Sequence, residues 1–518
     1  MRFQCICLFT STLIGFVCGY KILIVSPLPS QSHYILCRGL AAGLVNAGHD
    51  VTFITPFNNN PPKGNGSFKY VAIGNCMEEF FKVGEKERNY FEIEKSSPLM
   101  NLPLMNVFGG VCMKQAFENE NVKNLLRSNE KFDAVIMESL YTDGLAAFAC
   151  HYNAPLIALN PVGSAQWIND PVGNPTPPSY VPSIFFGFSD RMDFWQRSQN
   201  YLYSIISSLG HKLYTYPSQS ELVRKHFPNC PSVDEMQRNA ALILSNSHES
   251  TNYATTRVPN IIDIGGFHVN PSTEKLPNEL QKIMDSAKDG VIYFSLGSHV
   301  KPSHMPLEMK KAMIKVLGSL KQTILWKWDD DKFPDGAPSN IIVRKWFPQQ
   351  QILAHPNVKL FITHGGLLSL TEAIHLGVPM LALPVIGDQK LNAIRAELLG
   401  VGKRLFFADL TEESFRSALN ELLTNSKYNE NVKYRSKLYH DRPVKPLDLA
   451  MYWIEYVIRH KGAPHLRVFG RELPWYTYYC VDVIVFWSTI ISITLFIIFK
   501  LFKRICCSIR KDKKIKSS

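Results

Sequence analysis

The sequence predicts two α/β domains, each built on a parallel β-sheet, followed by one membrane-spanning helix. Three observations lead to this prediction. Short apolar runs alternate with helix-like segments in two separate stretches, a segment rich in Pro, Gly and Asn divides them, and an almost purely apolar run lies near the end of the chain. With 518 residues, 46% of them hydrophobic, the chain is long enough to bury two cores.

The first half opens with a strand, a loop, a helix and a second strand. Residues 21–25 are a short apolar run, 33–47 form a helix-like stretch closed by Gly48, and 50–55 are a second apolar run. Further buried strands are expected at 134–137 and 155–159, around a helix over about 143–152. The Pro- and aromatic-rich stretch 163–232 has no clear pattern, and we expect it to line the acceptor site or to touch the membrane.

The second half restarts the same pattern after residue 280. Its predicted strands are 291–298, 323–328, 341–344, 360–363 and 380–383. Both halves are therefore Rossmann-like, and two such domains that face each other place a cleft at the carboxyl ends of their strands. We expect a first domain at residues 20–250, a linker at 251–280 and a second domain at 281–470.

The two ends of the chain predict a membrane topology. Residues 1–19 combine one positive charge, an apolar run and Gly19 near a plausible cut, as in a secretory signal peptide. Residues 481–501 can cross a bilayer, and the tail 502–518 is basic. Seven of the twelve net positive charges lie from Lys500 onward, so the positive-inside rule keeps this end cytosolic. Little support is left for nucleic-acid binding.

Smaller features agree with a lumenal body. Asn65 begins the sequon Asn-Gly-Ser in a polar loop and is a candidate glycosylation site. Lys514 and Lys516 resemble a dilysine signal for retrieval to the endoplasmic reticulum. The body's cysteines are sparse and odd in number, so no disulfide framework is expected, and no cluster predicts a metal.

The most informative segment reads WFPQQQILAHPNVKLFITHGGLLSLTEAIHLGVPMLALPVIGDQ, over residues 346–389. The strand before His364 is followed by a tight turn, Gly365-Gly366, and then by a helix. Bare backbone N–H groups at such a helix start suit a diphosphate. Around this turn stand further side chains that suit a nucleotide sugar. They are Trp346 for a planar base, Ser369 for phosphate, Glu372 for a ribose, and Asp388 and Gln389 for sugar hydroxyls.

This segment resembles the signature of the UDP-glycosyltransferases, and of their insect-type members in particular. The resemblance covers nearly the whole chain and implies a GT-B fold, in which two Rossmann-like domains face each other. It implies that the N-terminal domain, 20–250, binds the acceptor and that the C-terminal domain, 281–470, binds the UDP-sugar donor. It implies that Trp346 stacks on uracil, Gln349 reaches the uridine, and His364 and Ser369 meet the diphosphate. Glu372 would then bind the ribose, Asp388 and Gln389 the sugar, and Ser298 would approach the phosphates from a second loop. Plant relatives carry Asn where this chain has Leu368, so that contact is absent or replaced.

The resemblance also implies that His33 is the general base, on the loop after the first strand. A carboxylate should fix its tautomer, as in triad logic. Two acids compete for this role: Glu138 stands where vertebrate and plant relatives carry Asp, and Asp143 matches an Asp of insect-type members. We favour Asp143, because it begins a helix after the strand, and keep Glu138 as the second candidate.

The expected activity is inverting transfer of a hexose, with glucose favoured, from a UDP-sugar to a small lipophilic acceptor. The resemblance implies an anchored enzyme of the endoplasmic reticulum that serves detoxification or conjugation, without a cofactor or metal, and it allows a homo-oligomer. Asp329-Asp330-Asp331 mimics a metal-binding DxD pattern but reads as a solvated turn. A non-catalytic, membrane-tethered protein that binds UDP-sugars or lipophiles is the alternative. An NAD-dependent oxidoreductase is excluded because no GxGxxG follows a first strand.

Overall fold

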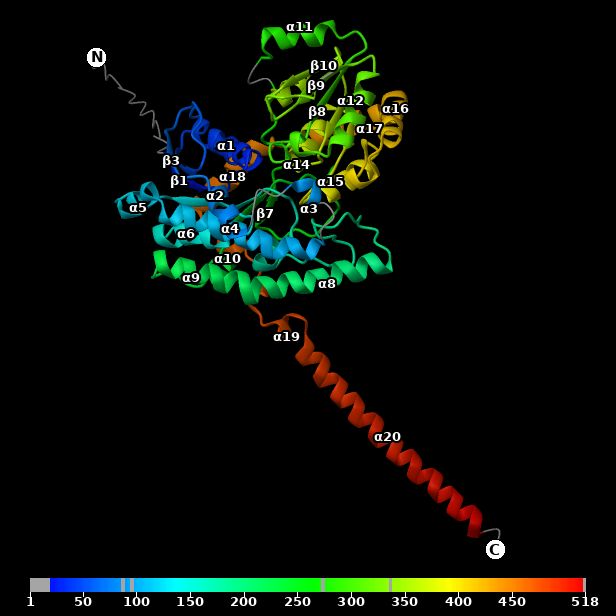
Figure 1. Cartoon of the computed structure of the whole chain (residues 1–518). Helices are drawn as coiled ribbons and strands as arrows, with labels where there is room; N and C mark the ends of the chain where they lie inside the picture. The colour runs from blue at the N-terminus through cyan, green and yellow to red at the C-terminus, as the bar shows by residue number, and fades with distance from the viewer. Residues whose placement is uncertain (1–18, 85–88, 94–96, 272–274, 335–337, 516–518) are drawn as a thin grey trace, which may run out of the picture. The chain divides into compact units, whose positions relative to one another are not determined.

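The computed structural model describes residues 19–84, 89–93, 97–271, 275–334 and 338–515 (Figure 1). Two compact units divide the chain: Met1–Arg467 and Val468–Ser518. The expected signal peptide lies outside the described residues, apart from Gly19, and so does Lys516. The first unit contains two parallel β-sheets of the Rossmann type, which confirms the predicted fold class for the body of the protein.

The first sheet has seven parallel strands in the order β3-β2-β1-β4-β5-β6-β7. They are β1 (Lys21–Val25), β2 (Asp50–Thr55), β3 (Phe68–Ala72), β4 (Ala134–Glu138), β5 (Leu156–Asn160), β6 (Leu242–Ser245) and β7 (Ile261–Asp263). The α-helices of this part are α1 (Gln31–Asn46), α2 (Met77–Gly84), α3 (Tyr90–Ile93), α4 (Asn101–Glu118), α5 (Glu120–Arg127), α6 (Ala147–Tyr152), α7 (Gln166–Asn169), α8 (Phe194–Gly210), α9 (Tyr216–His226) and α10 (Val233–Arg238).

The strands are buried on both faces, as parallel sheets require. In β1, Leu23 and Val25 join the core beneath α4, while Ile22 and Ile24 join the core beneath α1. This alternation follows from the two-residue period of a strand. Asp143 begins a short 3-10 turn, Asp143–Ala146, which precedes α6.

The second sheet has six parallel strands in the order β10-β9-β8-β11-β12-β13. They are β8 (Val291–Ser295), β9 (Thr323–Lys327), β10 (Ile341–Arg344), β11 (Val358–Thr363), β12 (Met380–Ala382) and β13 (Gly402–Arg404). Its helices are α11 (Asn278–Ser286), α12 (Leu307–Gly318), α13 (Gln349–Leu353), α14 (Leu367–Leu376), α15 (Gln389–Leu398), α16 (Glu412–Thr424) and α17 (Ser426–His440). The α12 and α16 helices bury one face of the sheet, and α11, α14 and α17 bury the other.

The last helix of the first unit, α18 (Pro446–Arg459), returns to the first sheet. Its buried face, Ala450, Met451, Ile454 and Val457, packs in the same core as α1, and Glu455 contacts His49 at 3.1 Å. By sequence this helix falls within the expected C-terminal domain, 281–470. In the structure it fastens the end of the second domain onto the first.

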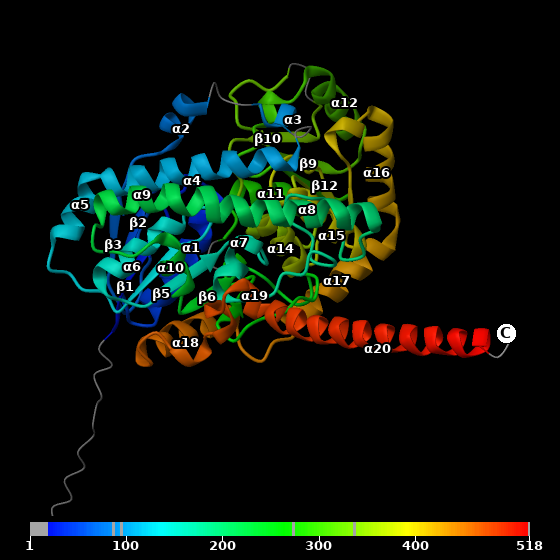
Figure 2. The same cartoon turned by 90° about the horizontal axis from the view of Figure 1, so that it is seen from below.

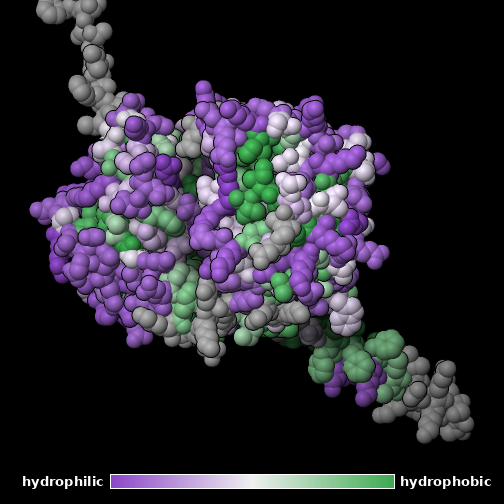
Figure 3. Space-filling model, turned by 45° about the horizontal axis from the view of Figure 1, so that its top comes forward, coloured by the Kyte–Doolittle hydropathy of each residue, from purple (hydrophilic) through white to green (hydrophobic). Residues whose placement is uncertain are grey.

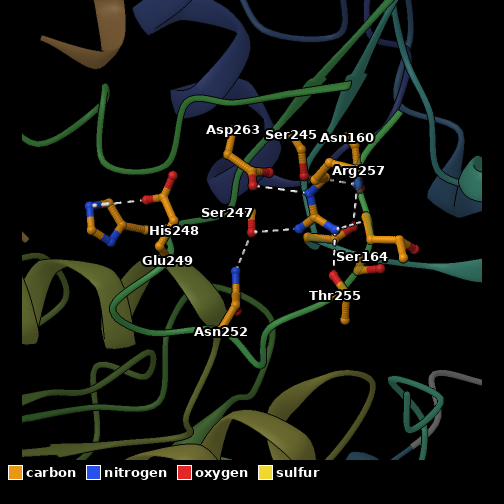
Figure 4. A network of polar contacts seen from close by, with 12 residues as sticks. Asn160, Ser164, Ser245, Ser247, His248, Glu249, Asn252, Thr255, Arg257 and Asp263 are labelled. Carbon is orange, nitrogen blue, oxygen red and sulfur yellow. Dashed lines mark hydrogen bonds and ion pairs between the residues drawn. The ribbon is translucent and has the colours of Figure 1, made fainter. Parts of the chain in front are cut away.

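The segment between the sheets is also well structured. Strand β7 of the first sheet falls within the expected linker, 251–280. Figure 4 shows Arg257 at the centre of a polar network there: its Nε donates to Asp263 at 3.0 Å and its Nη1 to Thr255. Arg395 of α15 donates to Asn252 at 2.9 Å. The second domain is therefore hydrogen-bonded to this segment.

Two disulfides correct the expectation that the body's cysteines form no disulfide framework. Cys76 bonds to Cys112, and Cys150 bonds to Cys230, while Cys37 is buried and free. The pairs are 36 and 80 residues apart in sequence. Because the helices and loops that carry them are brought together only by the folded sheet, their spacing shows no framework pattern.

One face of α8 is apolar and exposed. Figure 2, the view from below, shows α8 beside α4 and α9 on the face of the first unit that is turned toward the viewer. Tyr203 and Ser207 point inward, whereas Trp195 is 72% exposed. The large apolar side chains exposed along this helix and just after it are Phe194, Trp195, Tyr201, Leu202, Ile205, Ile206, Leu209, Leu213 and Tyr214.

The second unit consists of α19 (Trp475–Tyr478) and the long helix α20 (Val481–Ile515). Residues 481–507 are long and apolar enough to cross a bilayer, with a mean hydropathy of 2.3, and none of that surface is buried. The part of α20 drawn in colour in Figure 3 is mostly hydrophobic. The apolar stretch predicted at 481–501 is thus a helix, which continues into the basic tail.

Candidate active site

A cavity of about 530 Å³ lies between the two sheets of the first unit. Its walls include the loops that follow β1, β8, β11 and β12, so it sits at the carboxyl ends of the strands, where open α/β sheets bind ligands. The predicted site residues that line it are His33, Ser298, Trp346, Gln349, His364, Gly366, Ser369, Glu372, Asp388 and Gln389. Gly365 lies within the turn beside this wall.

The His364 turn is built on glycines for steric reasons. Gly365 has φ +79°, and Gly297, in the loop after β8, has φ +78°. A Cβ placed on Gly297 or on Gly366 would lie 2.7 Å from the His364 ring. The imidazole therefore occupies space that only glycine leaves open. Helix α14 begins at Leu367 with Gly366 as its N-cap, so its first N–H groups are available to an anion.

A half-buried lysine that sequence reasoning missed stands beside this turn. Nζ of Lys327, the last residue of β9, donates to the Gly297 carbonyl at 2.9 Å and lies 4.4 Å from the centre of the Trp346 ring. Burial lowers the pKa of Lys327 to about 8. Burial, with His299 and Lys327 nearby, lowers the pKa of His364 to about 3. The turn thus offers one cation and one neutral imidazole to a ligand at pH 7.

The Glu372 carboxylate, on α14, is held by two side-chain amides from α13. Gln349 Nε2 donates to its Oε2 at 2.5 Å, and Gln350 Nε2 donates to its Oε1 at 3.0 Å. Burial raises the pKa of Glu372. Gln349 also lies 3.5 Å from Ser369 Oγ. This group presents hydrogen-bond acceptors and donors close to Trp346, whose side chain is 58% exposed. A stacked ring and a hydroxylated sugar fit together here.

The loop after β12 supplies the last polar pair. Oδ2 of Asp388 accepts from Asn392 at 2.7 Å, and burial raises the pKa of Asp388. Gln389 is turned toward its own loop, where its Oε1 accepts the N–H groups of Val385 and Ile386 at 2.8 and 3.0 Å. Ser298 is exposed on the facing wall. In this structure Gln389 orders the loop that carries Asp388.

His33 is paired with Glu138. Nδ1 of His33 contacts Oε1 of Glu138, and the Ser26 hydroxyl donates to Oε2 of the same carboxylate. Glu138 is buried and His33 partly exposed. Burial alone would lower the pKa of His33, but the charge and hydrogen bond of Glu138 raise it above its usual value. With Nδ1 engaged, Nε2 is the nitrogen left to accept a proton.

The preference for Asp143 as the partner of His33 is wrong. The Asp143 carboxylate is buried, and neither oxygen has a hydrogen-bond partner among the described residues. Burial raises its pKa to about 7. Its backbone carbonyl accepts from Gln237 at 2.7 Å, which places the residue against α10. Glu138 reaches His33 because it ends β4, directly beside β1 in the sheet, whereas Asp143 lies in the following turn.

The opposite end of the cavity is apolar. It is lined by side chains from the first domain, namely Leu28, Ile35, Met77, Phe80, Phe81, Leu104, Met105, Phe108, Leu140, Ile184 and Phe185. Leu368 lines the cavity and packs against the first domain's core beneath α1. The cavity therefore has one polar end on the second domain and one apolar end on the first, with His33 between them.

The remaining candidates lie away from this cavity. Asp329 accepts the N–H and hydroxyl of Ser303 at 3.0 and 2.6 Å, and Asp331 pairs with Lys345 at 2.6 Å. The acidic run is thus an exposed, locally paired turn, and none of it lines the cavity. Asn65 is exposed in the loop before β3. Sequence reasoning also missed Ser26, Ser30, His299 and Gln350, because their partners are distant in sequence.

Comparison with known proteins agrees with this geometry. The family model described as "UDP-glucoronosyl and UDP-glucosyl transferase" matches residues 21–516. UDP-glucosyltransferase 2 of Dactylopius coccus is 36% identical over 92% of this chain and 91% of its own. Human UDP-glucuronosyltransferase 1A8 is 31% identical over 95% and 92%. The crystal structure of the calicheamicin glycosyltransferase CalG4 superposes with a TM-score of 0.57 at 18% identity, covering 85% of this chain and 99% of that one, which shows the shared GT-B fold.

Proposed function

Because the chain belongs to the UDP-glycosyltransferase family, we propose that it transfers glucose from UDP-glucose to a hydroxyl of a small lipophilic acceptor, with His33 as the general base and inversion at the anomeric carbon. The observation that carries this proposal is the His33–Glu138 pair, which lies between a polar and an apolar end of one cavity. A cofactor or a metal has no step in the proposed reaction.

The donor occupies the polar end in this proposal. Trp346 stacks on uracil, and Glu372 exchanges its bond to Gln349 for the ribose hydroxyls, while Gln349 turns to the uridine. The diphosphate lies at the start of α14, where Gly365, Gly366, His364, Ser369 and Ser298 surround it. Lys327 adds the positive charge that a diphosphate needs, and its ammonium donates to a backbone carbonyl of the Gly297 loop.

The reaction is a single displacement. Nε2 of His33 takes the acceptor's hydroxyl proton while the acceptor oxygen forms its bond to C1 of the sugar. The bond from C1 to the β-phosphate oxygen breaks, and UDP leaves with that electron pair. Glu138 stabilises the imidazolium that forms, and His364 and Lys327 stabilise the charge on the leaving phosphate. The intact pair favours this enzymatic function over a protein that only binds UDP-sugars.

Charge at the sugar end favours a neutral hexose over glucuronate. Asp388 lines that end with a carboxylate, and Gln389 stands beside it. Among the described residues that line the cavity, Lys327 carries the only Lys or Arg side chain, and it sits at the Trp346 end. The carboxylate of a glucuronyl group would therefore meet a like charge without a partner.

We also propose that the body is lumenal and tethered to the endoplasmic reticulum membrane by α20. The two disulfides and the exposed Asn65 suit an oxidising, glycosylating compartment. Val481 follows Arg467 by only 14 residues, so the tether is short. The exposed apolar face of α8 fits a lipid surface, with Arg191, Arg197 and Lys212 beside it to meet headgroups.

The test is turnover in microsomes that carry the full chain. UDP-glucose, UDP-glucuronate and UDP-N-acetylglucosamine are offered with a panel of small phenols, for wild type, His33→Ala and a control, His151→Ala, which changes an exposed histidine. We expect β-glucosides, a loss of roughly 10²-fold or more in His33→Ala, and no effect of EDTA. Full activity of His33→Ala would overturn the base assignment, and preference for UDP-glucuronate would overturn the choice of donor.

A further inference from the structure

A hydrogen bond crosses the cavity from one domain to the other beside the proposed base. Nε2 of His299 lies 2.8 Å from the hydroxyl of Ser30. His299 belongs to the loop after β8 in the second domain and follows Ser298 directly. Ser30 belongs to the loop after β1 in the first domain, and both residues line the cavity. The contact therefore joins the loop of the donor site to the loop that precedes His33.

Ser30 makes this contact in place of its usual local role. It is the N-cap residue of α1, a position where serine commonly accepts a backbone N–H bond, yet its side chain makes no capping bond. The hydroxyl instead contacts His299 and, at 3.1 Å, the hydroxyl of Ser32. Ser30 is buried, and His33 follows it by one turn of α1. A shift of this hydroxyl would move the start of the helix that carries His33.

His299 is held neutral by its surroundings. Burial, together with His33 and Lys327 nearby, lowers its pKa to about 4. The His299 imidazole also affects the donor site, because it contributes to the low pKa of His364. The carboxylates of Glu138 and Asp388 face His33 rather than His299. A neutral imidazole can share one hydrogen bond with a serine hydroxyl without placing a second positive charge beside protonated His33.

We propose that His299 is a positioning residue that, through Ser30, sets the closed register of the two domains and so places His33 over the anomeric carbon. This inference rests on the proposed function of the same site. Base and donor sit on different domains, and in-line transfer needs the acceptor oxygen and C1 within about 3–3.5 Å. One cross-domain bond next to both groups is well placed to fix that distance.

The proposal predicts where the kinetic effect falls. In the proposed complex, UDP is held by side chains of the second domain. Loss of the His299–Ser30 contact, called the latch below, therefore leaves UDP binding almost unchanged. The rate of the chemical step falls, because the base is held less often in the reactive geometry. We expect His299→Ala and Ser30→Ala each to lower kcat about 5- to 20-fold, as for one lost hydrogen bond at a reacting centre. The donor KM should change less than twofold.

The experiment is a double-mutant cycle on the full chain in detergent or microsomes. It comprises His299→Ala, Ser30→Ala and the double variant, with His299→Gln as the conservative variant that keeps a polar group near the position of Nε2. If the two residues act through one bond, the double variant is no slower than the single ones, and His299→Gln recovers part of kcat. Additive losses, or a loss in donor KM instead of kcat, would overturn the proposal.

Another cross-domain bond provides the matched control. Nδ2 of Asn89 donates to the His304 carbonyl at 3.2 Å, away from the start of α1, which carries His33. Asn89→Ala should leave kcat within twofold of wild type. If it lowers kcat as much as His299→Ala, then any bond between the domains serves equally, and the specific role of His299 fails.

Hydrogen exchange gives a readout that does not depend on transfer. UDP added to wild type should protect the amides of residues 28–36, although UDP itself binds to the second domain. In His299→Ala this remote protection should be lost, while protection of residues 364–369 persists. If wild type shows the remote protection yet transfers no sugar, the proposed function fails and the latch stands. If UDP protects 28–36 equally in both proteins, the latch fails whatever the activity.

Discussion

Oε1 of Glu138 contacts Nδ1 of His33, although the two residues are 105 positions apart in sequence. The contact exists because β1 and β4 are neighbours: Val25 pairs with Met137, so Glu138 ends its strand beside the start of the β1 loop. The Ser26 hydroxyl then holds the second carboxylate oxygen. Base, acid and orienting hydroxyl are thus placed by the order of two central strands.

Glu138→Gln should lower kcat by roughly 10²-fold or more, since the imidazolium loses its counter-charge. Because Glu138 raises the pKa of His33, the neutral base of the wild type is lost as pH falls through a value above 6.5. Without the carboxylate, burial lowers that pKa, so the acid limb of kcat/KM should move to lower pH. Asp143→Asn is the comparison: it should leave this limb in place, and a shift equal to that of Glu138→Gln would contradict the pairing.

Asp143 should instead govern stability against pH. Its folded pKa of about 7 lies above the ordinary value of 3.8, so the folded state binds the extra proton between these values. The free energy of unfolding therefore falls as pH rises from about 4 to about 7, by up to about 1.4 kcal/mol per pH unit. Asp143→Asn should remove this fall and raise the melting temperature at pH 8. The exposed Asp289→Asn should change neither, and an unaltered pH profile in Asp143→Asn would count against a buried, unpaired acid.

Gly297→Ala should abolish donor binding. Both Gly297 and Gly387 have positive φ, at +78° and +63°, so alanine strains the backbone at either position. A Cβ on Gly297 would lie 2.7 Å from the His364 ring, whereas nothing lies within 4 Å of one on Gly387. Calorimetric titration with UDP should show a much larger loss of affinity for Gly297→Ala than for Gly387→Ala. Equal losses would mean that backbone strain, not the imidazole, sets the effect.

Lys327→Met should weaken UDP about tenfold or more while leaving uridine nearly unchanged, because a charged hydrogen bond to the diphosphate is lost. The pKa of Lys327 is about 8, so UDP affinity of the wild type should also decline as pH rises through that value. The exposed Lys332→Met serves as the control. Equal weakening of UDP and uridine would show that Lys327 only supports Trp346.

Leu202→Asp with Leu209→Asp should reduce contact of the body with lipid, because charges would enter the apolar face of α8. A photoactivatable phospholipid in the host bilayer should label residues 194–214 of the wild type, and the double variant should lose this label. Labelling of residues 481–507 should persist in both. Tyr434→Asp, at an exposed aromatic residue on α17, is the matched control. Unlabelled wild-type α8 beside a labelled span would contradict the lipid contact.

The sequence by itself determined the parts of the site that are local. The strand, the turn and the helix around His364 follow one another within 20 residues, and β11, Gly365-Gly366 and α14 form as expected. The glycine requirement, the helix start and the apolar run of α20 depend only on near neighbours. Most strands were predictable for the same reason, because a buried parallel strand is a continuous apolar run. The strands β3, β6, β7 and β13 were not predicted. β3, β7 and β13 lie at sheet edges with mixed burial, whereas β6 is buried but only four residues long.

The tertiary structure alone decided which distant groups meet. Glu138 rather than Asp143 reaches His33 because strand order, not chain order, sets neighbours in a sheet. The two disulfides, the return of α18 to the first core and the His299–Ser30 contact arise in the same way. Each joins segments from 36 to more than 200 residues apart. Periodicity and motif spacing describe interactions within a few turns of chain, whereas packing of whole layers brings these pairs together.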